Sequence, residues 1–454
     1  MKLVTIGVYV RRQFASHAGG LPITCLALAL CWLAGAAFGQ VTTARFYPTV
    51  QDSSGGAIQG AAVTLTHEGT NASYRKTTDA TGEALFDVLP VGSYALTIEA
   101  PGFKRFHSKG IELTASQQTQ QTFTLDVGAV TETVTVESTA PLVSAASSEQ
   151  RESLSSMQVA ELPLSRRNVT NVLRVAPGVD VGGGSVRING QGKSGAGITV
   201  DGTDANANPS EGRSMEQYGG RNYIDVMSIE AVQEVQLMRG VMAAEYGGVI
   251  SGQVNLISKS GSNAFHGSLF ELYRSHLFNA RNPFRPSRNS DGTMISRDRE
   301  VFNQFGGSLG GRIWRDKLFF FTTYEGYRES GFQRVTGTVP TPALKAEFLR
   351  ALPFRETKLL MDLLPEPVVP LDENRGRFEG AGDRKRKENH VIARGDYRPT
   401  QAGNLSLTYT RNRPFGLDPN FMLNGSNDRI YEYLQDRYSV QYTQSGPHWV
   451  LESR

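Results

Sequence analysis

Two short runs have the residue types of ligand-binding loops, but neither has the context that its chemistry needs. Gly190-Gln-Gly192-Lys-Ser-Gly195 has the glycine spacing of a dinucleotide-binding loop, which requires a helix directly after it to meet the pyrophosphate. The residues that follow, 198–200, predict a strand. Asp204 begins a calcium-loop spacing, but Pro209 replaces the required glycine. We therefore assign neither a cofactor nor a calcium ion to this region.

Composition narrows the class of protein. A chain of 454 residues should hold two or more domains, and a formal net charge of +3 argues against nucleic acid as a partner. The two cysteines, Cys25 and Cys31, lie in the N-terminal segment, so the rest of the chain has no disulfide. Histidines occur singly, without the spacing of zinc ligands, so we expect no metal site and no peptidase centre.

The first residues have the features of a secretory signal peptide, covering residues 1–39. Lys2 and Arg11 precede an apolar stretch from Leu21 to Phe38. The alternative is a retained membrane anchor, for which Pro22 makes the stretch short and weak. No later stretch is as long and apolar. Any membrane insertion of the mature chain must therefore use a closed barrel of strands.

The run VQEVQLMRGVMAAEYGGVISGQVNLISKSG, residues 232–261, predicts a strand, a tight turn at Arg239-Gly240, a short helix and a second strand. In this order and spacing it closely resembles the end of the plug domain of TonB-dependent outer-membrane receptors. The resemblance implies that Arg239 pairs with acidic groups inside the barrel wall. It also implies a set of residues that are structural in the plug: Arg239, Gly240, Tyr246, Gly247 and Gly252.

We expect the plug domain to span residues 149–261. The pattern predicts helices at 149–162 and 168–175, the first ended by Pro163 and the second by Pro177-Gly178. It also predicts short strands at 185–189 and 198–201.

Residues 41–126 predict a small β-sandwich of about seven strands, because short alternating runs are separated by turn signals about every ten residues. The string TDATGEALFDVLPVGSYALTIEAPGFKRF resembles the carboxypeptidase regulatory-like domain, which has a carbohydrate-binding-like fold and no peptidase chemistry. If this module binds sugar, its local candidates for aromatic stacking are Tyr74, Phe103 and Phe106.

The linker, residues 127–148, begins with strictly alternating valine and threonine. One interpretation is a last strand of the sandwich or an extended connection. The resemblance offers another, a TonB box, which is an extended peptide that adds as a strand to the periplasmic TonB protein. The candidate contact residues are Thr133, Val134, Thr135 and Val136.

Residues 262–454 are rich in aromatic residues and alternate cleanly, as transmembrane barrel strands do. Strands are predicted near 266–275, 302–313, 317–328, 388–398, 404–412 and 430–443. Long connections, including Ser330–Glu388 with its basic run Arg384–Lys387, alternate with short turns, as external loops alternate with periplasmic turns. Thr341-Pro342 predicts a short helix in that loop. Because plugged transporters use about 22 strands, we expect this chain to be the N-terminal part of a longer protein.

Together these patterns predict a mainly β protein: a small β-sandwich, then an α+β plug, then an incomplete transmembrane β-barrel. The resemblance, to the Oar-like group of TonB-dependent receptors, implies a non-enzymatic transporter in the outer membrane, with plug and sandwich facing the periplasm. Its implied partners are TonB, outer-membrane lipid and an unknown substrate, which could be a carbohydrate. The alternatives are an outer-membrane adhesion or interaction protein, and carbohydrate binding through the sandwich.

The signal peptide gives the first testable prediction. Ala37 and Gly39 are the small residues that signal peptidase needs, so the mature chain should begin at Gln40. N-terminal sequencing of the exported protein measures this directly. Exported protein that still carries Leu26 to Ala37 would show instead that the segment is a retained anchor.

Overall fold

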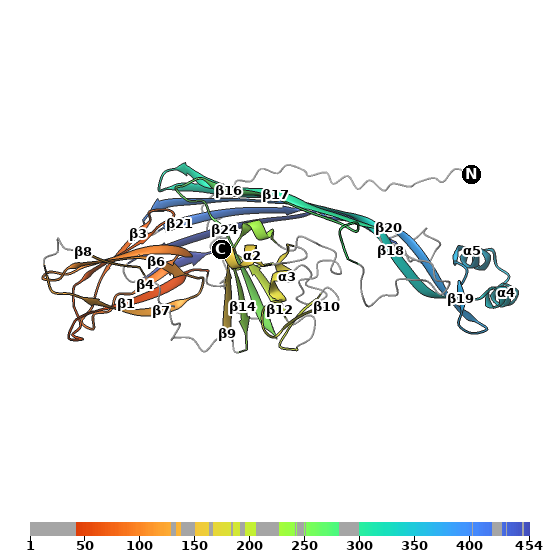
Figure 1. Cartoon of the computed structure of the whole chain (residues 1–454), viewed down its shortest axis with the longest axis horizontal. Coiled ribbons are helices and arrows are strands. Elements are labelled where there is room, and N and C mark those ends of the chain that lie inside the picture. The colour runs from red at the N-terminus through yellow and green to blue at the C-terminus, as the bar shows by residue number, and fades with distance from the viewer. Residues whose placement is uncertain are drawn as a thin grey trace, which may run out of the picture. The chain divides into compact units, whose positions relative to one another are not determined.

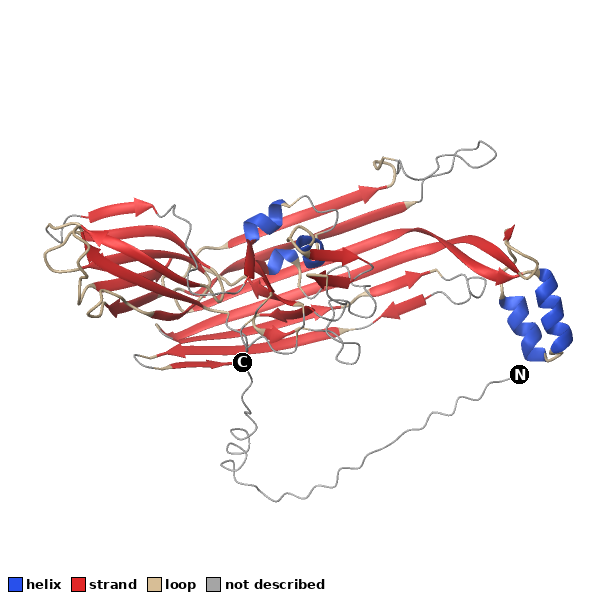
Figure 2. Cartoon of the chain, turned by 90° about the horizontal axis from the view of Figure 1, so that it is seen from below, coloured by secondary structure: helices blue, strands red, loops and turns tan. Residues whose placement is uncertain are grey.

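The computed structural model describes most of the chain after the predicted signal peptide, within one compact unit, Gly39–Arg454. The described residues are 42–128, 133–137, 150–162, 167–182, 185–190, 196–205, 227–240, 242, 249, 251–280, 299–401, 403–419, 429–432, 434–446 and 449–454. The signal peptide and Gln40 lie outside them. Nearly all regular structure among them is β, arranged in five sheets, which confirms the predicted mainly β fold (Figures 1 and 2).

The first part of the chain forms a sandwich of two sheets. Its strands are β1 (Ala44–Asp52), β2 (Ala62–His67), β3 (Ser73–Thr77), β4 (Phe86–Leu89), β5 (Gly92–Glu99), β6 (Arg105–Leu113) and β7 (Gln118–Leu125). One sheet has the order β4-β1-β7, and the other contains β3-β2-β5-β6. Alternate residues point inward, so that Tyr94, Leu96 and Ile98 of β5 are all buried. Both sheets contribute to one hydrophobic core, and the predicted seven strands are confirmed.

An eighth strand, β8 (Thr133–Glu137), extends the second sheet beyond β6. The two strands are parallel, with pairing from Arg105 opposite Thr133 to Lys109 opposite Glu137. β8 is therefore an edge strand of the sandwich, and it comes from the stretch predicted as a linker.

The plug follows, drawn in yellow and green in Figure 1. Its elements are β9 (Gln150–Ser155), α2 (Ser156–Glu161), α3 (Val169–Leu173), β10 (Val179–Gly182), β11 (Ser185–Ile188), β12 (Ala196–Val200), β13 (Thr203–Asp204), the 3₁₀ helix η1 (Ile229–Ala231), β14 (Val232–Arg239) and β15 (Gly252–Ser258). The central sheet has the order β13-β12-β15-β14-β9, and β10 pairs with β11 separately. Val235 and Leu237 of β14 and Val254 and Leu256 of β15 lie in the plug's core.

The predicted helix at 149–162 is wrong in its first half. Residues 150–155 form β9, which pairs antiparallel with β14, and only Ser156–Glu161 are helical. Tertiary pairing along an open strand edge overrides weak local helix propensity here. Ser155 caps α2 in a capping box with Gln158. The helix predicted at 168–175 is confirmed as α3, with Asn168 as its N-cap.

The last part of the chain is one large antiparallel sheet. Its strands are β16 (His266–Ser275), β17 (Glu300–Trp314), β18 (Leu318–Pro340), β19 (Val369–Pro370), β20 (Arg375–Thr400), β21 (Gly403–Asn412), β22 (Phe415–Asp418), β23 (Arg429–Glu432), β24 (Gln435–Ser445) and β25 (Val450–Ser453). The main path runs β16-β17-β18-β20-β21-β24-β25, so strands that follow each other along the chain are mostly neighbours.

The two faces of this sheet differ, as barrel strands require. Phe321, Thr323 and Glu325 of β18 are buried on the plug side, and Phe321 joins the plug's hydrophobic core. Leu407 of β21 and Val440 of β24 are large apolar residues that stay exposed on the opposite face. The predicted inward and outward alternation is therefore confirmed.

The segment Ser330–Glu388 is not the plain loop that its length predicted. β18 and β20 continue as a long hairpin that carries the helices α4 (Pro342–Ala351) and α5 (Arg355–Leu363) near its tip (Figure 2). The basic run is part of β20, where Arg384 pairs with Glu329 of β18, because cross-strand neighbours supply the counter-charge. The predicted helix after Thr341 is confirmed as α4. None of the helices in the described part of the chain has the length and hydrophobicity that crossing a membrane requires.

The turn after β14 yields the second testable prediction. Gly240 has a φ of +73°, and an added Cβ would meet nothing closer than the Gln150 Oε1, 3.9 Å away. Gly240→Val should therefore lower the free energy of unfolding of the plug by about 1–2 kcal/mol through backbone strain alone. Gly240→Asn is the matched control, since asparagine tolerates this conformation better and should lose less. Equal urea stabilities for the wild type and the valine variant would contradict the argument.

Candidate functional site

Arg239 holds the end of β14 to the rest of the plug. Its Nη2 lies 3.3 Å from the Glu152 Oε2 of β9, and its Nη1 donates to the carbonyl of Pro177. Glu152 pairs with Leu237 across the β9–β14 ladder, which places it diagonally beside Arg239. The structure thus gives Arg239 an acidic partner inside the plug, whereas the resemblance implied a partner on the barrel wall.

Gly252, at the start of β15, is required by close packing. An added Cβ would lie 2.7 Å from the carbonyl oxygen of Met238 and 2.9 Å from the Ile188 side chain. A larger residue would separate β15 from β14 at the point where Arg239 pairs with Gly252. Tyr246 and Gly247, predicted for the same motif, lie outside the described residues.

A first polar cluster joins η1 of the plug to three wall strands. Glu230 accepts a hydrogen bond from Ser268 of β16 at 2.6 Å and pairs with Arg167 at 2.7 Å. The backbone carbonyl of Arg167 accepts one from Gln304 of β17 at 3.0 Å, and Ser228 donates to Glu325 of β18. Burial opposes ionisation of Glu230, but these partners hold its pKa below the ordinary value. The Glu230 carboxylate is therefore charged at neutral pH, and Ser268 and Arg167 are its partners.

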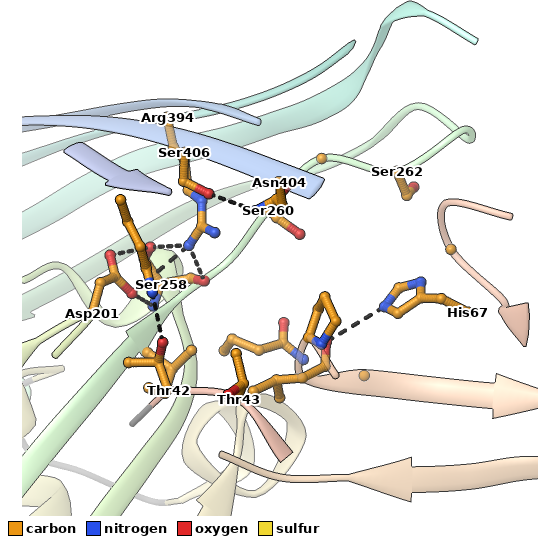
Figure 3. A pocket seen from close by; sticks show the side chains of 18 of the residues that line it. Thr42, Thr43, His67, Asp201, Ser258, Ser260, Ser262, Arg394, Asn404 and Ser406 are labelled. Atoms are coloured by element: carbon orange, nitrogen blue, oxygen red, sulfur yellow. Dashed lines mark hydrogen bonds and ion pairs between the residues drawn. The ribbon is translucent and has the colours of Figure 1, made fainter. Parts of the chain in front are cut away.

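A second polar cluster joins the ends of β12 and β15 to strand β20 (Figure 3). The Arg394 Nη1 donates to the backbone oxygen of Ser258 at 3.0 Å and to its Oγ at 2.7 Å. The same guanidinium binds Asp396 through two nitrogens and lies 3.7 Å from Asp201. Asp201 in turn accepts from the Ser258 amide and hydroxyl. Because Asp201 and Asp396 are buried and Arg394 is partly buried, each of these charges needs its partners to be stable there.

A third contact comes from β24. The Arg437 Nη2 donates to the carbonyls of Val200 and Thr203 at 3.2 and 2.9 Å. The plug is therefore bound by hydrogen bonds or ion pairs to β16, β17, β18, β20 and β24. Such contacts fix its position without any covalent link, and each can be broken separately.

A cavity of about 520 Å³ lies where the sandwich, the plug and the wall meet. Figure 3 shows Thr42, Thr43 and His67 facing it from one side, and Arg394, Asn404 and Ser406 from the other. Burial, and then the nearby Arg398, lower the pKa of His67 to about 4, so this imidazole is neutral at physiological pH. Among the described residues, no group of three acidic, histidine or cysteine side chains is arranged to hold a metal ion.

The candidate sugar-stacking residues are used for packing. Tyr74, Phe103 and Phe106 are partly buried against the sandwich core, and the Phe106 ring packs edge-on against Phe123 with centroids 5.5 Å apart. The candidate TonB-box residues Thr133–Val136 form most of β8, on the edge of the same domain.

Sequence reasoning missed the wall residues that hold the plug. Arg394 and Asp396 are two residues apart in a strand, so they share a face, and this spacing marks an inward-facing charged pair. Glu234 and Gln236 alternate with Val235 and Leu237 in β14 in the same way. The polar face of this otherwise apolar strand indicated that this face, too, packs against another part of the protein.

Three protein families match consecutive parts of the chain. The carboxypeptidase regulatory-like domain matches residues 48–126, the TonB-dependent receptor plug domain matches residues 146–253, and an outer membrane beta barrel domain matches residues 257–454.

Individual proteins are similar to parts of the chain. The TonB-dependent transporter Oar of Myxococcus xanthus is 28% identical over 272 residues, which cover 58% of this chain and 24% of that protein. The ferrienterobactin receptor of Escherichia coli is 31% identical over 119 residues, 22% of this chain and 15% of that one. The outer membrane transporter YddB of Escherichia coli, a solved structure, aligns over 66% of this chain and 38% of its own, with 13% identity and a TM-score of 0.44.

The matched region thus spans about a quarter, or less, of the length of these two sequence relatives. The order of the three domains, together with a sheet that is apolar on one face and bound to a plug on the other, identifies the family. The protein belongs to the TonB-dependent receptors of the outer membrane, with an N-terminal carboxypeptidase regulatory-like domain and a plug followed by barrel strands.

Proposed function

We propose that this protein takes up a substrate through its plugged barrel, and that TonB supplies the energy by pulling on residues Thr133–Val136. The family is one of non-enzymatic transporters, so movement of the plug takes the place of a chemical step. The observation that carries the proposal is the plug's attachment: five wall strands hold it through separable polar contacts.

β8 supports the proposed point of coupling. It is already extended, and it ends the sheet order β3-β2-β5-β6-β8, so one side of its main chain faces away from β6. A partner strand recognises such an edge through backbone hydrogen bonds, with little dependence on side chains. In the sequence β8 lies between the sandwich and the plug, so a pull on it would act just ahead of β9, the edge strand of the plug sheet.

The substrate class is a separate question. The relatives include a protein named as a ferrienterobactin receptor and one named as a probable TonB-dependent siderophore receptor. Ferric siderophores are therefore a reasonable first group for a binding screen, with oligosaccharides as the second group because of the sandwich's fold.

Coupling through β8 gives the third testable prediction. Val134→Pro removes one backbone donor and fixes φ, so the affinity of the receptor for the periplasmic domain of TonB should fall by about tenfold or more. Val134→Ala, the matched control, keeps the main chain and should bind nearly as well as the wild type. Calorimetry with the purified receptor measures both, and any substrate taken up should follow the same order.

The same variants separate the two interpretations of β8. If the strand only closes the sandwich, Val134→Pro should lower the melting temperature of the sandwich while TonB binding and energised uptake stay normal. That result would remove the box from this position.

A further inference from the structure

The turn between β6 and β7 of the sandwich, residues Thr114–Gln117, enters a polar recess on the plug. Ala115 is fully buried, although it lies in a turn that connects the two sheets of the sandwich, and Ser116 has a φ of +54°. A buried turn of this kind needs partners for its backbone groups, because they cannot reach water.

The plug supplies those partners from two neighbouring strands. The Ala115 amide donates to the Glu234 Oε2 of β14 at 3.1 Å, and the Gln236 Nε2 donates to the Ala115 carbonyl. The Arg151 Nη1 of β9 donates to the Ser116 carbonyl at 2.5 Å. Glu234 and Gln236 are themselves buried, so the turn and the recess satisfy each other.

The recess is one end of a chain of side-chain hydrogen bonds across the plug sheet. Gln236 donates to Glu234 at 2.9 Å, Asn255 of β15 donates to Gln236 at 3.3 Å, and Thr199 of β12 donates to Asn255 at 3.0 Å. Buried networks of this kind are stable only when every member is satisfied. Withdrawing the turn would therefore disturb the sheet as well as the recess.

The sandwich also holds the wall. The Asn71 Nδ2 donates to Asp316 in the β17–β18 turn at 3.1 Å, and the Arg398 Nη1, near the end of β20, donates to Thr70 at 2.8 Å. The Gln441 Nε2 of β24 donates to Thr42 at 3.0 Å. The sandwich thus forms hydrogen bonds with the plug sheet on one side and with three wall strands or their turns on the other.

We propose that the sandwich acts as a latch, which means that its contacts keep the plug in place in the barrel. The Thr114–Gln117 turn, which we call the bolt, inserts into the recess formed by Glu234, Gln236 and Arg151. The plug cannot shift relative to the wall without breaking either the bolt contacts or the wall contacts of the sandwich. A pull on β8 would reach the bolt through β6, whose C-terminal end leads into it. Only this last link rests on the proposed function.

The test uses cysteine labelling in membranes from cells that lack TonB, so that the result does not depend on coupling. Residues 40–454 contain no cysteine, so Ala231→Cys places one thiol in this part of the receptor, and labelling of the receptor without this substitution is subtracted as the background. Ala231 is fully buried in η1, an element that contacts β17 and β18, so we expect a maleimide to reach this position only when the plug separates from the wall. The measured quantity is the rate at which a maleimide labels this cysteine in the assembled receptor.

Ala115→Arg should expel the bolt, because the added side chain has no room in the recess, and should speed labelling by about tenfold or more. Ala80→Arg is the matched control: the same substitution in an exposed turn of the same domain, which should leave the rate unchanged. Protease resistance of the sandwich and heat-modifiable migration of the barrel show that both remain folded. Equal rates for the two variants would overturn the latch.

If the receptor with Ala115→Arg fails to assemble, a second variant tests the latch. Asn71→Gly removes the contact with Asp316 from the wall side, and glycine accepts the φ of +56° that Asn71 has. The latch predicts faster labelling here too, and an unchanged rate would overturn it. Failure of TonB binding in the Val134 variants would leave both labelling results standing, so the two proposals fail independently.

Discussion

The alternation of side chains along the wall strands is the constraint on which the rest of the structure depends. Lipid on one side excludes polar groups, so Leu407 and Val440 point outward and polar residues gather on the inner face. Buried polar groups on that face must find partners. Glu325 finds Ser228, and Arg394 finds Ser258 and Asp201. The plug is therefore held by the same residues that the membrane forces inward.

The plug sheet differs from the wall sheet, because protein surrounds it on several sides and its side chains must find partners on each of them. Val235 and Leu237 fill its own core, whereas Glu234 and Gln236 on the other face of β14 meet the sandwich. Its edges and strand ends contact the wall through Arg394 and Arg437. Its attachment to the wall thus combines apolar packing, in which Phe321 and Ile392 join the plug's core, with hydrogen bonds and ion pairs. The hydrogen bonds and ion pairs are directional and separable, so the plug is well positioned and still removable.

Local signals were enough for features that depend on neighbouring residues. The strand that ends at Arg239-Gly240, the positive φ of Gly240, the cap of α3 at Asn168 and the alternating burial of β5 and β24 were all predictable, because backbone sterics and period-two burial depend on consecutive residues. Features that depend on pairing between residues far apart in the sequence could not be predicted in this way.

β9 forms because it pairs with the edge of β14. The basic run of β20 is ordered because Glu329 of β18 pairs with Arg384. Arg239 pairs with Glu152, which lies 87 residues away in the chain. The contact of Arg394 with Asp201 is of the same kind, since it joins residues from different domains of the chain. Nothing in either local sequence specifies the other.

The central claim is that inward-facing wall residues and the plug stabilise each other directly. A double-mutant cycle on Asp201→Asn and Arg394→Gln, measured by urea unfolding of the plug in the assembled receptor, tests it most directly. Partners in one buried cluster should show a coupling free energy of about 1–3 kcal/mol. A coupling free energy of zero, with each single variant merely adding to the other, would contradict the account.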